Sequence, residues 1–306
     1  MDKFNEIALI KGVAEAVLSN RDNTADGLYP DKAVVRDIIN KLQYILVPEY
    51  FSREHGSLPE YGVGAALEEV FHKLQKQIAL VFGALPEERD NSENAKALTL
   101  EFLQRIPFIR ETLLTDVEAV YEGDPSAYSK AEIIISYPGI YAVMVQRMAH
   151  ELHLLEVPLI PRIMTEHAHS ITGIDIHPGA VIGRYFFIDH GTGITIGETA
   201  VIGNNVKIYQ GVTVGALSTR GGQLLKGVKR HPTIEDNVTI YSGASILGGN
   251  TVIGENTVIG GTAFVTKSVP EKTKVSVKSP ELQFRNSDNV LQKKELEQDD
   301  SWVYMI

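Results

Sequence analysis

The first half of the chain carries the apolar pattern of amphipathic helices. From residue 1 to about residue 171, apolar residues recur every three or four positions, and prolines interrupt the pattern at intervals. This spacing predicts a helical domain over residues 1–172. The predicted helices cover 4–20, 31–46, 64–85, 92–104, 108–123 and 137–157, and the prolines that interrupt the pattern are Pro48, Pro59, Pro86, Pro107, Pro125 and Pro138.

After Gly173 the pattern changes, and aliphatic residues return every six positions with mostly small or polar residues between them. The repeat forms two runs, the first interrupted by a two-residue slip and the second by one extra residue. The repeating positions are Ile176, Ile182, Ile188, Ile196, Ile202, Ile208 and Val214 in the first run, and Ile234, Ile240, Ile246, Ile253, Ile259 and Val265 in the second.

A period of six is neither the helical nor the ordinary strand period. Six residues make a short strand and a corner, so three such steps close one triangular coil whose aliphatic residues point into a shared interior. Glycine and asparagine between the repeats tolerate the positive φ that a corner needs. The chain is therefore predicted to be an α+β protein, with a parallel β-helix over residues 173–278 and a polar tail over residues 279–306.

Charge and composition narrow the class of partner. The chain has 29 basic and 39 acidic residues, a formal charge of -10, which disfavours nucleic acid as a partner. No apolar run is long enough to cross a membrane, and the N-terminus lacks the apolar region of a signal peptide. We therefore expect a cytoplasmic protein that does not bind membranes. The absence of cysteine excludes disulfides, thiol nucleophiles and thiolate metal sites.

One interruption of the repeat predicts a protruding loop. Twenty residues separate Val214 from Ile234, where six would continue the coil. The loop could be a plain solvated connection, but it is basic in an acidic chain, which favours a lid or wall for an anionic ligand. Its exit, Arg230-His231, brings a guanidinium and an imidazole back to the coil. The basic residues of the loop are Arg220, Lys226, Lys229 and Arg230.

A second interruption contains a candidate general base. His190 follows a repeating isoleucine by two positions, so its side chain is expected to project from the coil. Asp175 lies fifteen residues earlier, close to one turn of the helix, and stacking could bring the two side chains together. A carboxylate beside an imidazole fixes its tautomer and supports the imidazolium that forms when histidine takes a proton.

These residues coincide with the motifs of a known family. The stretch "DIHPGAVIGRYFFIDHGTGITIGETAVIG", followed by "VTVGA", a loop and "RHPTIEDNVTI", resembles serine O-acetyltransferase, a hexapeptide-repeat enzyme that acetylates L-serine from acetyl-CoA in cysteine synthesis. The resemblance extends from about Asp124 to Pro270. It implies a left-handed β-helix, and it implies direct transfer without an acyl-enzyme, which fits a chain that lacks a nucleophile motif.

The resemblance assigns roles to six residues of this chain. His190 would remove the serine hydroxyl proton, with Asp175 as its orienting partner, and His231 would lie against the reacting atoms. Arg230 would pair with the serine carboxylate, for which its planar fork of donors is suited. Asp124 and Asp189 would hold the serine ammonium.

The acetyl-CoA site is less well defined by the motifs. The residues expected to contact the coenzyme are Gly215, Ala216, Gly243 and Lys267. The late-coil stretch "IGENTVIGG" lacks the basic residue that the family commonly uses for coenzyme A phosphates, and the usual "GxPA" element is replaced by "VSVKSPELQFRN". Lys267 or the basic loop could substitute. No metal is expected.

The resemblance also implies partners. The family assembles as trimers with active sites between subunits, so we expect a homotrimer or a dimer of trimers, with the helical domain in oligomerisation and in part of the serine site. L-cysteine often inhibits family members at the serine site. The chain ends in Ile306, which matches the C-terminal isoleucine that many members insert into O-acetylserine sulfhydrylase.

Two other functions remain open from the sequence. The histidines could supply a zinc site between subunits, as in β-helical carbonic anhydrases, although Arg230 beside His231 opposes a cation. A catalytically silent scaffold that binds a sulfhydrylase through its tail is the other alternative, and the presence of all the polar site residues argues against it. The histidines available to a zinc site are His167, His169, His177, His190 and His231.

Overall fold

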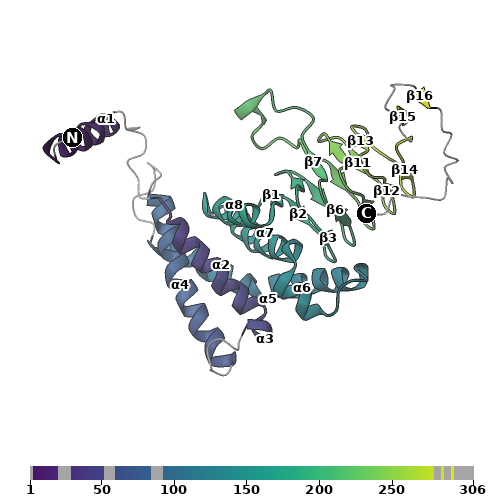
Figure 1. The fold of residues 1–306 in the computed structure, drawn as a ribbon. Helices are drawn as coiled ribbons and strands as arrows, with labels where there is room; N and C mark the ends of the chain where they lie inside the picture. The colour runs from purple at the N-terminus through teal and green to yellow at the C-terminus, as the bar shows by residue number, and fades with distance from the viewer. Residues whose placement is uncertain are drawn as a thin grey trace.

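The structure is a computed structural model that describes residues 3–19, 29–51, 59–83, 92–278, 284–285 and 291–292. Helices make up the N-terminal region and short parallel strands make up the rest (Figure 1), which confirms the predicted order of the two parts. The helices are α1 (Lys3–Ser19), α2 (Lys32–Leu46), α3 (Pro48–Phe51), α4 (Pro59–Gly83), α5 (Ser92–Gly123), α6 (Lys130–Ser136), α7 (Pro138–Leu154) and α8 (Ile160–Thr172).

Several helix boundaries follow from local chemistry. Asp31 begins α2, where its side chain accepts a hydrogen bond from the backbone N–H of Ala33 at 2.7 Å. Ser129 caps α6 in the same way through the N–H of Glu132. Pro48, Pro59 and Pro138 each stand first in a helix, a position where the missing N–H costs no hydrogen bond.

The predicted helix break at Pro107 is wrong, because α5 runs through it as one helix. An internal proline removes a backbone hydrogen bond and costs about 3 kcal/mol. Buried side chains on both sides of it, Ile106 and Ile109 among them, hold the helix against the core and offset that cost. Helix α8 was also not predicted, since the sequence pattern ended its last helix at residue 157.

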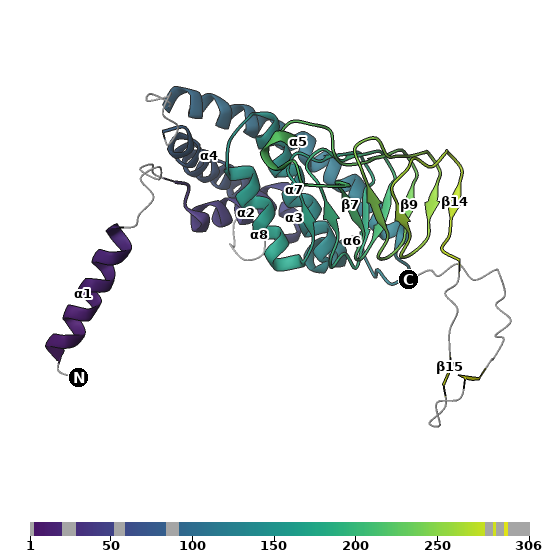
Figure 2. The same cartoon turned by 90° about the horizontal axis from the view of Figure 1, so that it is seen from above.

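Helix α1 forms over the predicted residues as far as Ser19, where the described segment ends, and lies apart from the other helices in both views (Figures 1 and 2). Its apolar side chains are exposed, and Ile10 is the most exposed of them at 68%. The described side chains of α1 are therefore not part of the buried core of the helical region.

The strands form a parallel solenoid with three faces. Successive strands pass from face A to face B to face C and back, so that equivalent strands pair one coil apart (Figure 2). Face A contains β1 (Asp175–Ile176), β4 (Thr195–Ile196), β7 (Thr213–Gly215), β10 (Ser245–Leu247) and β13 (Phe264–Val265). Face B contains β2 (Val181–Ile182), β5 (Val201–Ile202), β8 (Thr233–Ile234) and β11 (Val252–Ile253). Face C contains β3 (Phe187–Asp189), β6 (Lys207–Tyr209), β9 (Thr239–Ile240), β12 (Val258–Ile259) and β14 (Lys274–Val275).

The six-residue repeat supplies the interior of the solenoid, as predicted. All of the repeating aliphatic residues are buried except Ile182, which is partly buried. Each buried Ile or Val stabilises the fold by roughly 1.5–3 kcal/mol relative to exposure. Asn205 and Gly243 occupy corners with φ of 54° and 69°, which confirms the expectation for such residues.

Helix α7 joins the helical region to the first coil. Ala142 and Val143 belong to the buried cluster of the solenoid. Gln146 donates to the carbonyl of Ala180 at 2.9 Å, and Arg147 donates to the carbonyls of Ile182 and Gly183. The helix thus satisfies backbone oxygens that the first coil, having no coil before it, would otherwise leave unpaired.

Arg147 also makes a buried ion pair with Asp116 of α5, with hydrogen bonds of 2.6 and 2.8 Å to the two carboxylate oxygens. Asp116 accepts a further bond from the N–H of Phe186. Burial raises the pKa of Asp116, against the opposing charge of Arg147. One ion pair therefore connects two helices to the solenoid.

Two edges of the solenoid carry the polar residues of interest. The C–A edge consists of the corners from face C to face A, for example between β3 and β4, and the A–B edge consists of the corners from face A to face B. The predicted loop leaves the A–B edge between β7 and β8, and contains the short 3₁₀ helix η2 (Gly222–Leu225). It projects from the solenoid (Figure 1), and its Leu224 is 89% exposed.

The described part of the C-terminal tail is the antiparallel pair β15 (Phe284–Arg285) and β16 (Leu291–Gln292). Ile306 lies outside the described residues. Among the helices of the described chain, none combines the length and apolar character needed to span a bilayer.

Candidate active site

His190 stands on the C–A edge, where the chain departs from the six-residue step. Strand β3 ends at Asp189, and His190 follows with φ of 54°, a left-handed conformation. A Cβ at Gly191 would lie 2.4 Å from the side chain of Ile174, so only glycine fits there. This corner turns His190 outward, with 62% of its side chain exposed.

Asp124 reaches the same edge from the helical region. Its carboxylate accepts hydrogen bonds from the Tyr137 hydroxyl at 2.7 Å and from the hydroxyl and N–H of Ser126 at 2.6 and 2.8 Å. Burial acts to raise the pKa of Asp124, but these bonds and the charge of His190 outweigh it and lower the pKa. Asp124 is therefore a fixed carboxylate at neutral pH.

Asp189 completes this group, with its carboxylate 3.8 Å from Nδ1 of His190. Tyr209 stands opposite Asp189 in the strand register. Burial raises the pKa of Tyr209, and the neighbouring Tyr241, Asp189 and Asp124 raise it further. The structure thus brings together three predicted residues, Asp124, Asp189 and His190.

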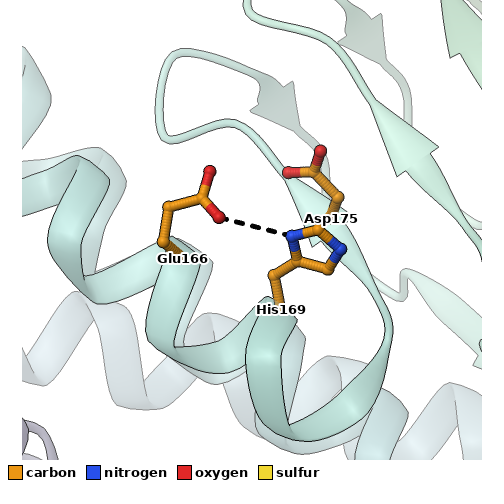
Figure 3. Close-up of side chains that lie close together, drawn as sticks. All are labelled: Glu166, His169 and Asp175. Atoms are coloured by element: carbon orange, nitrogen blue, oxygen red, sulfur yellow. Dashed lines mark hydrogen bonds and ion pairs between the residues drawn. The ribbon is translucent and has the colours of Figure 1, made fainter.

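Asp175 was predicted to pair with the side chain of His190. No hydrogen bond or ion pair joins the two side chains in the described chain. Asp175 begins β1 and lies beside His169 and Glu166 of α8, with the nearest ligand atoms of all three within 4.8 Å of one another (Figure 3). The predicted pairing of Asp175 with His190 therefore stays a prediction.

His231 lies on the A–B edge and is 7% exposed. Its Nδ1 accepts hydrogen bonds from the backbone N–H of Thr199 at 3.0 Å and from the Thr199 hydroxyl at 2.9 Å. Because Nδ1 is an acceptor, the neutral ring carries its proton on Nε2. The ring packs directly over Gly197, and a Cβ added to Gly197 would lie 2.1 Å from the nearest ring atoms of His231.

Burial lowers the pKa of His231 to about 4, and the charge of Arg230 acts in the same direction. The ring is consequently neutral at physiological pH. It can donate a hydrogen bond from Nε2 to an oxygen atom, and it is poorly suited to take a proton.

Arg230 is held by an ion pair with Glu198, and its Nη1 donates to the carbonyl of Leu225 at 3.3 Å. Burial acts to raise the pKa of Glu198, but Arg230 outweighs this and lowers it. Lys229 donates to the backbone carbonyls of Thr199, His231 and Pro232, which fastens the loop exit to the A–B edge.

Sequence reasoning did not single out Glu198, Thr199, Ser126 and Tyr137. Glu198 and Thr199 stood within the quoted "GET" segment, so their position next to Gly197 was a usable signal. Tyr137 is thirteen residues from Asp124 across a helix boundary, and nothing in the local pattern pairs them.

The residues expected to contact acetyl-CoA are divided between the two edges. Gly243 lies on the C–A edge, where the corners at Gly193, Gly211 and Gly243 stack on one another. A Cβ added to Gly193 would lie 3.5 Å from the Cα of Gly211, and one added to Gly211 would lie 3.5 Å from the Cα of Gly243. Gly215 ends β7 on the A–B side, Ala216 follows it, and Lys267 is exposed after β13 on the last coil of that edge.

Face A therefore separates His190 from His231 within one chain. The histidines considered for zinc are similarly dispersed. In the described part of a single chain, His169 is the one of the five that belongs to a group of three potential metal ligands.

A parallel β-helix of six-residue steps, with a protruding loop and with histidine, carboxylate and arginine side chains on its edges, is the architecture of the hexapeptide-repeat proteins, among them the hexapeptide acyltransferases. The comparisons with known proteins narrow this class. A serine acetyltransferase encoded on a plasmid of Synechococcus elongatus is 45% identical over 222 residues, which are 68% of this chain and 70% of that protein. Matches to further curated serine acetyltransferases span about half of their length. No protein-family model matches the chain.

Solved structures agree with this result. A serine acetyltransferase isoform 3 from Entamoeba histolytica, in complex with cysteine, is 34% identical and superposes with a TM-score of 0.72 over 90% of this chain and 94% of that one. The Neisseria gonorrhoeae serine acetyltransferase in complex with serine is 28% identical, with a TM-score of 0.54 over 77% and 95%. The chain belongs to the serine acetyltransferase family.

Proposed function

We propose that this chain transfers the acetyl group of acetyl-CoA to the hydroxyl of L-serine, with His190 as the general base. The observation that carries this assignment is the group formed by Asp124, Asp189 and His190 on the C–A edge. An exposed imidazole beside two carboxylates, on a scaffold of this family, offers both a proton acceptor and a cradle for an ammonium group.

Serine recognition then follows from charge. Asp124 and Asp189 bind the ammonium, and Arg230 binds the carboxylate through donors that Glu198 leaves free. The neisserial relative with serine bound supports this substrate. L-Cysteine differs from serine only in its thiol, so we propose that it inhibits at the same site, as the amoebic complex with cysteine suggests.

In the proposed reaction the serine oxygen attacks the thioester carbonyl carbon while its proton passes to His190. Asp175 orients that ring and stabilises its charge. The negative oxygen of the tetrahedral intermediate accepts a hydrogen bond from Nε2 of His231, which is neutral and already carries the proton there. The carbon–sulfur bond then breaks, and the coenzyme thiolate takes the proton back from His190.

The proposed reaction needs His190 of the C–A edge and His231 of the A–B edge around the same substrate. We propose a homotrimer, with the further option of a dimer of trimers through the helices, in which the C–A edge of one subunit faces the A–B edge of the next. Acetyl-CoA would lie between them, along the glycine corners on one side and along Gly215, Ala216 and Lys267 on the other. Glycine corners leave room for an extended chain to approach the backbone.

We also propose that the enzyme is cytoplasmic and that the reaction uses no metal. A sulfhydrylase is the proposed partner, bound through Ile306. Binding of the purified chain to a sulfhydrylase, with and without the terminal isoleucine, tests the last point.

The central test is steady-state acetyl transfer with serine, homoserine and a sugar as acceptors. We expect serine to be preferred, and we expect His190→Ala to lower kcat by about 10²–10⁴ because the base is lost. His72→Ala, an exposed histidine on α4, is the matched control and should leave the rate unchanged. Near-normal turnover by a folded His190→Ala protein would refute the assigned base.

A further inference from the structure

Outside the residues that contact substrate in the proposed reaction, three side chains on α8 and β1 converge. Glu166 and His169 are three positions apart and share one side of α8, and Nδ1 of His169 lies 3.3 Å from the Glu166 carboxylate. Gly173 ends the helix in the left-handed conformation and turns the chain back, so that Asp175 lies over the same side (Figure 3). The group therefore arises from helix spacing and a helix-end turn.

The Asp175 carboxylate accepts no hydrogen bond from the residues that the structure describes, although it is half-buried. Glu166 is shared with Arg162, which forms an ion pair with it one helical turn earlier. In this structure the partly buried carboxylate of Asp175 is therefore available to a cation beside the imidazole of His169 and the second carboxylate, in competition with its proposed pairing with His190.

We propose that Glu166, His169 and Asp175 form a binding site for a divalent transition-metal ion such as Zn²⁺. One imidazole nitrogen and two carboxylate oxygens are ligands that zinc accepts, and three protein ligands leave a position open. The two negative charges of the carboxylates also match the charge of a dication.

The geometry needs only a small contraction. The ligand atoms lie within 4.8 Å of one another, whereas a tetrahedral ion with bonds of about 2.0–2.2 Å needs separations of roughly 3.3–3.6 Å. Glu166 and His169 keep 46% and 42% of their side-chain surface exposed, so they can move, and the ion can enter from solvent.

The site has a consequence for catalysis that rests on the proposed function. Asp175 is the proposed partner of His190, and a carboxylate bound to a metal cannot orient that ring. Zinc is therefore an inhibitor here and has no place in the acetyl transfer itself.

The binding test titrates Zn²⁺ into the untagged full-length protein against a chromophoric zinc chelator. We expect one ion per chain at this site, and His169→Gln should weaken its binding at least about tenfold because a ligand is removed. His167→Gln changes a histidine two positions away on α8 and is the matched control. Arg162→Gln should strengthen binding, since it frees Glu166. Equal zinc affinity of the wild type and His169→Gln, or no binding by the wild type, overturns the site.

The activity test measures acetyl transfer by the same proteins with increasing Zn²⁺. The wild type and His167→Gln should be inhibited over the concentrations at which the ion binds, while His169→Gln should keep the same basal rate and resist inhibition. Zinc bound at the site without inhibition overturns the link to Asp175. Absence of acetyl transfer in every protein, with zinc still bound, refutes the proposed function and leaves the metal site standing.

Discussion

Two histidines on the A–B edge illustrate what single residues contribute. Like His231, His177 accepts a backbone hydrogen bond on Nδ1, here from Gly179 at 3.0 Å. Burial lowers its pKa to about 4, with a further contribution from Arg162. His153 of α7 lies edge-on to it, with ring centroids 6.3 Å apart. Both His177 and His231 are therefore neutral rings whose Nδ1 accepts a backbone hydrogen bond and holds a corner of the coil.

These pKa values predict acid sensitivity. The unfolded chain has histidine pKa values near 6.5 and binds more protons than the folded chain between about pH 6.5 and 4. Stability from His177 and His231 is thus fully present above about pH 6.5 and is lost as the pH falls towards 4. His177→Asn keeps an acceptor for Gly179 but cannot titrate.

Thermal unfolding measured at several pH values checks the predicted loss of stability from His177. We expect the decrease in Tm from pH 7 to pH 4 to be smaller in His177→Asn than in the wild type, by about 2–4 °C, the shift that 1 kcal/mol causes in a domain of 150–250 residues. Part of the decrease should persist, because His231 still titrates. Parallel curves for the two proteins would contradict the assignment.

At the scale of elements, the helical region is attached to the solenoid through α5 and α7. Arg147 and Asp116 are both buried, whereas the nearby pair of Arg184 and Glu111, which also joins the first coil to α5, is exposed. A buried charge that loses its partner is costly, while an exposed pair contributes little.

Arg147→Met should therefore destabilise the protein by about 3–5 kcal/mol, because it leaves the Asp116 carboxylate buried without its cation. Arg184→Met makes the same chemical change at the exposed pair and should cost about 1 kcal/mol or less. Urea unfolding of both variants measures the difference. If the two variants lose similar free energies of unfolding, the buried ion pair stabilises the contact between the helices and the solenoid no more than the exposed pair does.

The elements also separate what local pattern can predict from what it cannot. The six-residue repeat predicted every face of the solenoid, because each aliphatic residue needs only its own strand and corner to point inward. The predicted helix break at Pro107 was wrong, because the tertiary packing of α5 outweighs the preference of proline to end a helix. The position of Asp175 beside His169 depended on α8, which the apolar pattern did not reveal.

At the scale of the whole molecule, the main question is how residues on two separate edges of the solenoid can form one active site. Asp124, Asp189 and His190 lie on one edge, and Arg230 and His231 lie on the other, with face A between them. The motifs imply that these residues act on one substrate. If these residues act on one substrate, as we propose, a second copy of the chain has to place its edge against the first.

Complementation between two inactive variants tests this arrangement. His190→Ala removes the base, and His231→Asn keeps the acceptor for Thr199 but removes the Nε2 donor. Each variant alone should be nearly inactive. In trimers assembled at random from equal amounts of both, about a quarter of the sites combine two intact edges, so about a quarter of the wild-type activity should return.

Activity of co-expressed chains, purified as mixed trimers, is the measurement, and the control is a mixture of the two variants assembled separately. A mixed protein as inactive as its parents would mean that both histidines of a site come from one chain.

The sequence by itself determined the helical region, the solenoid and its loop, since these follow from apolar spacing and corner residues that act within a few positions. It also contained the motifs that carry the family assignment. Only the tertiary structure decided that His231 is a neutral donor, that Asp124 is held by Tyr137, that Asp175 faces His169, and that the site residues are divided between two edges. Those properties depend on burial and on neighbours from distant parts of the chain, which no local pattern of residues encodes.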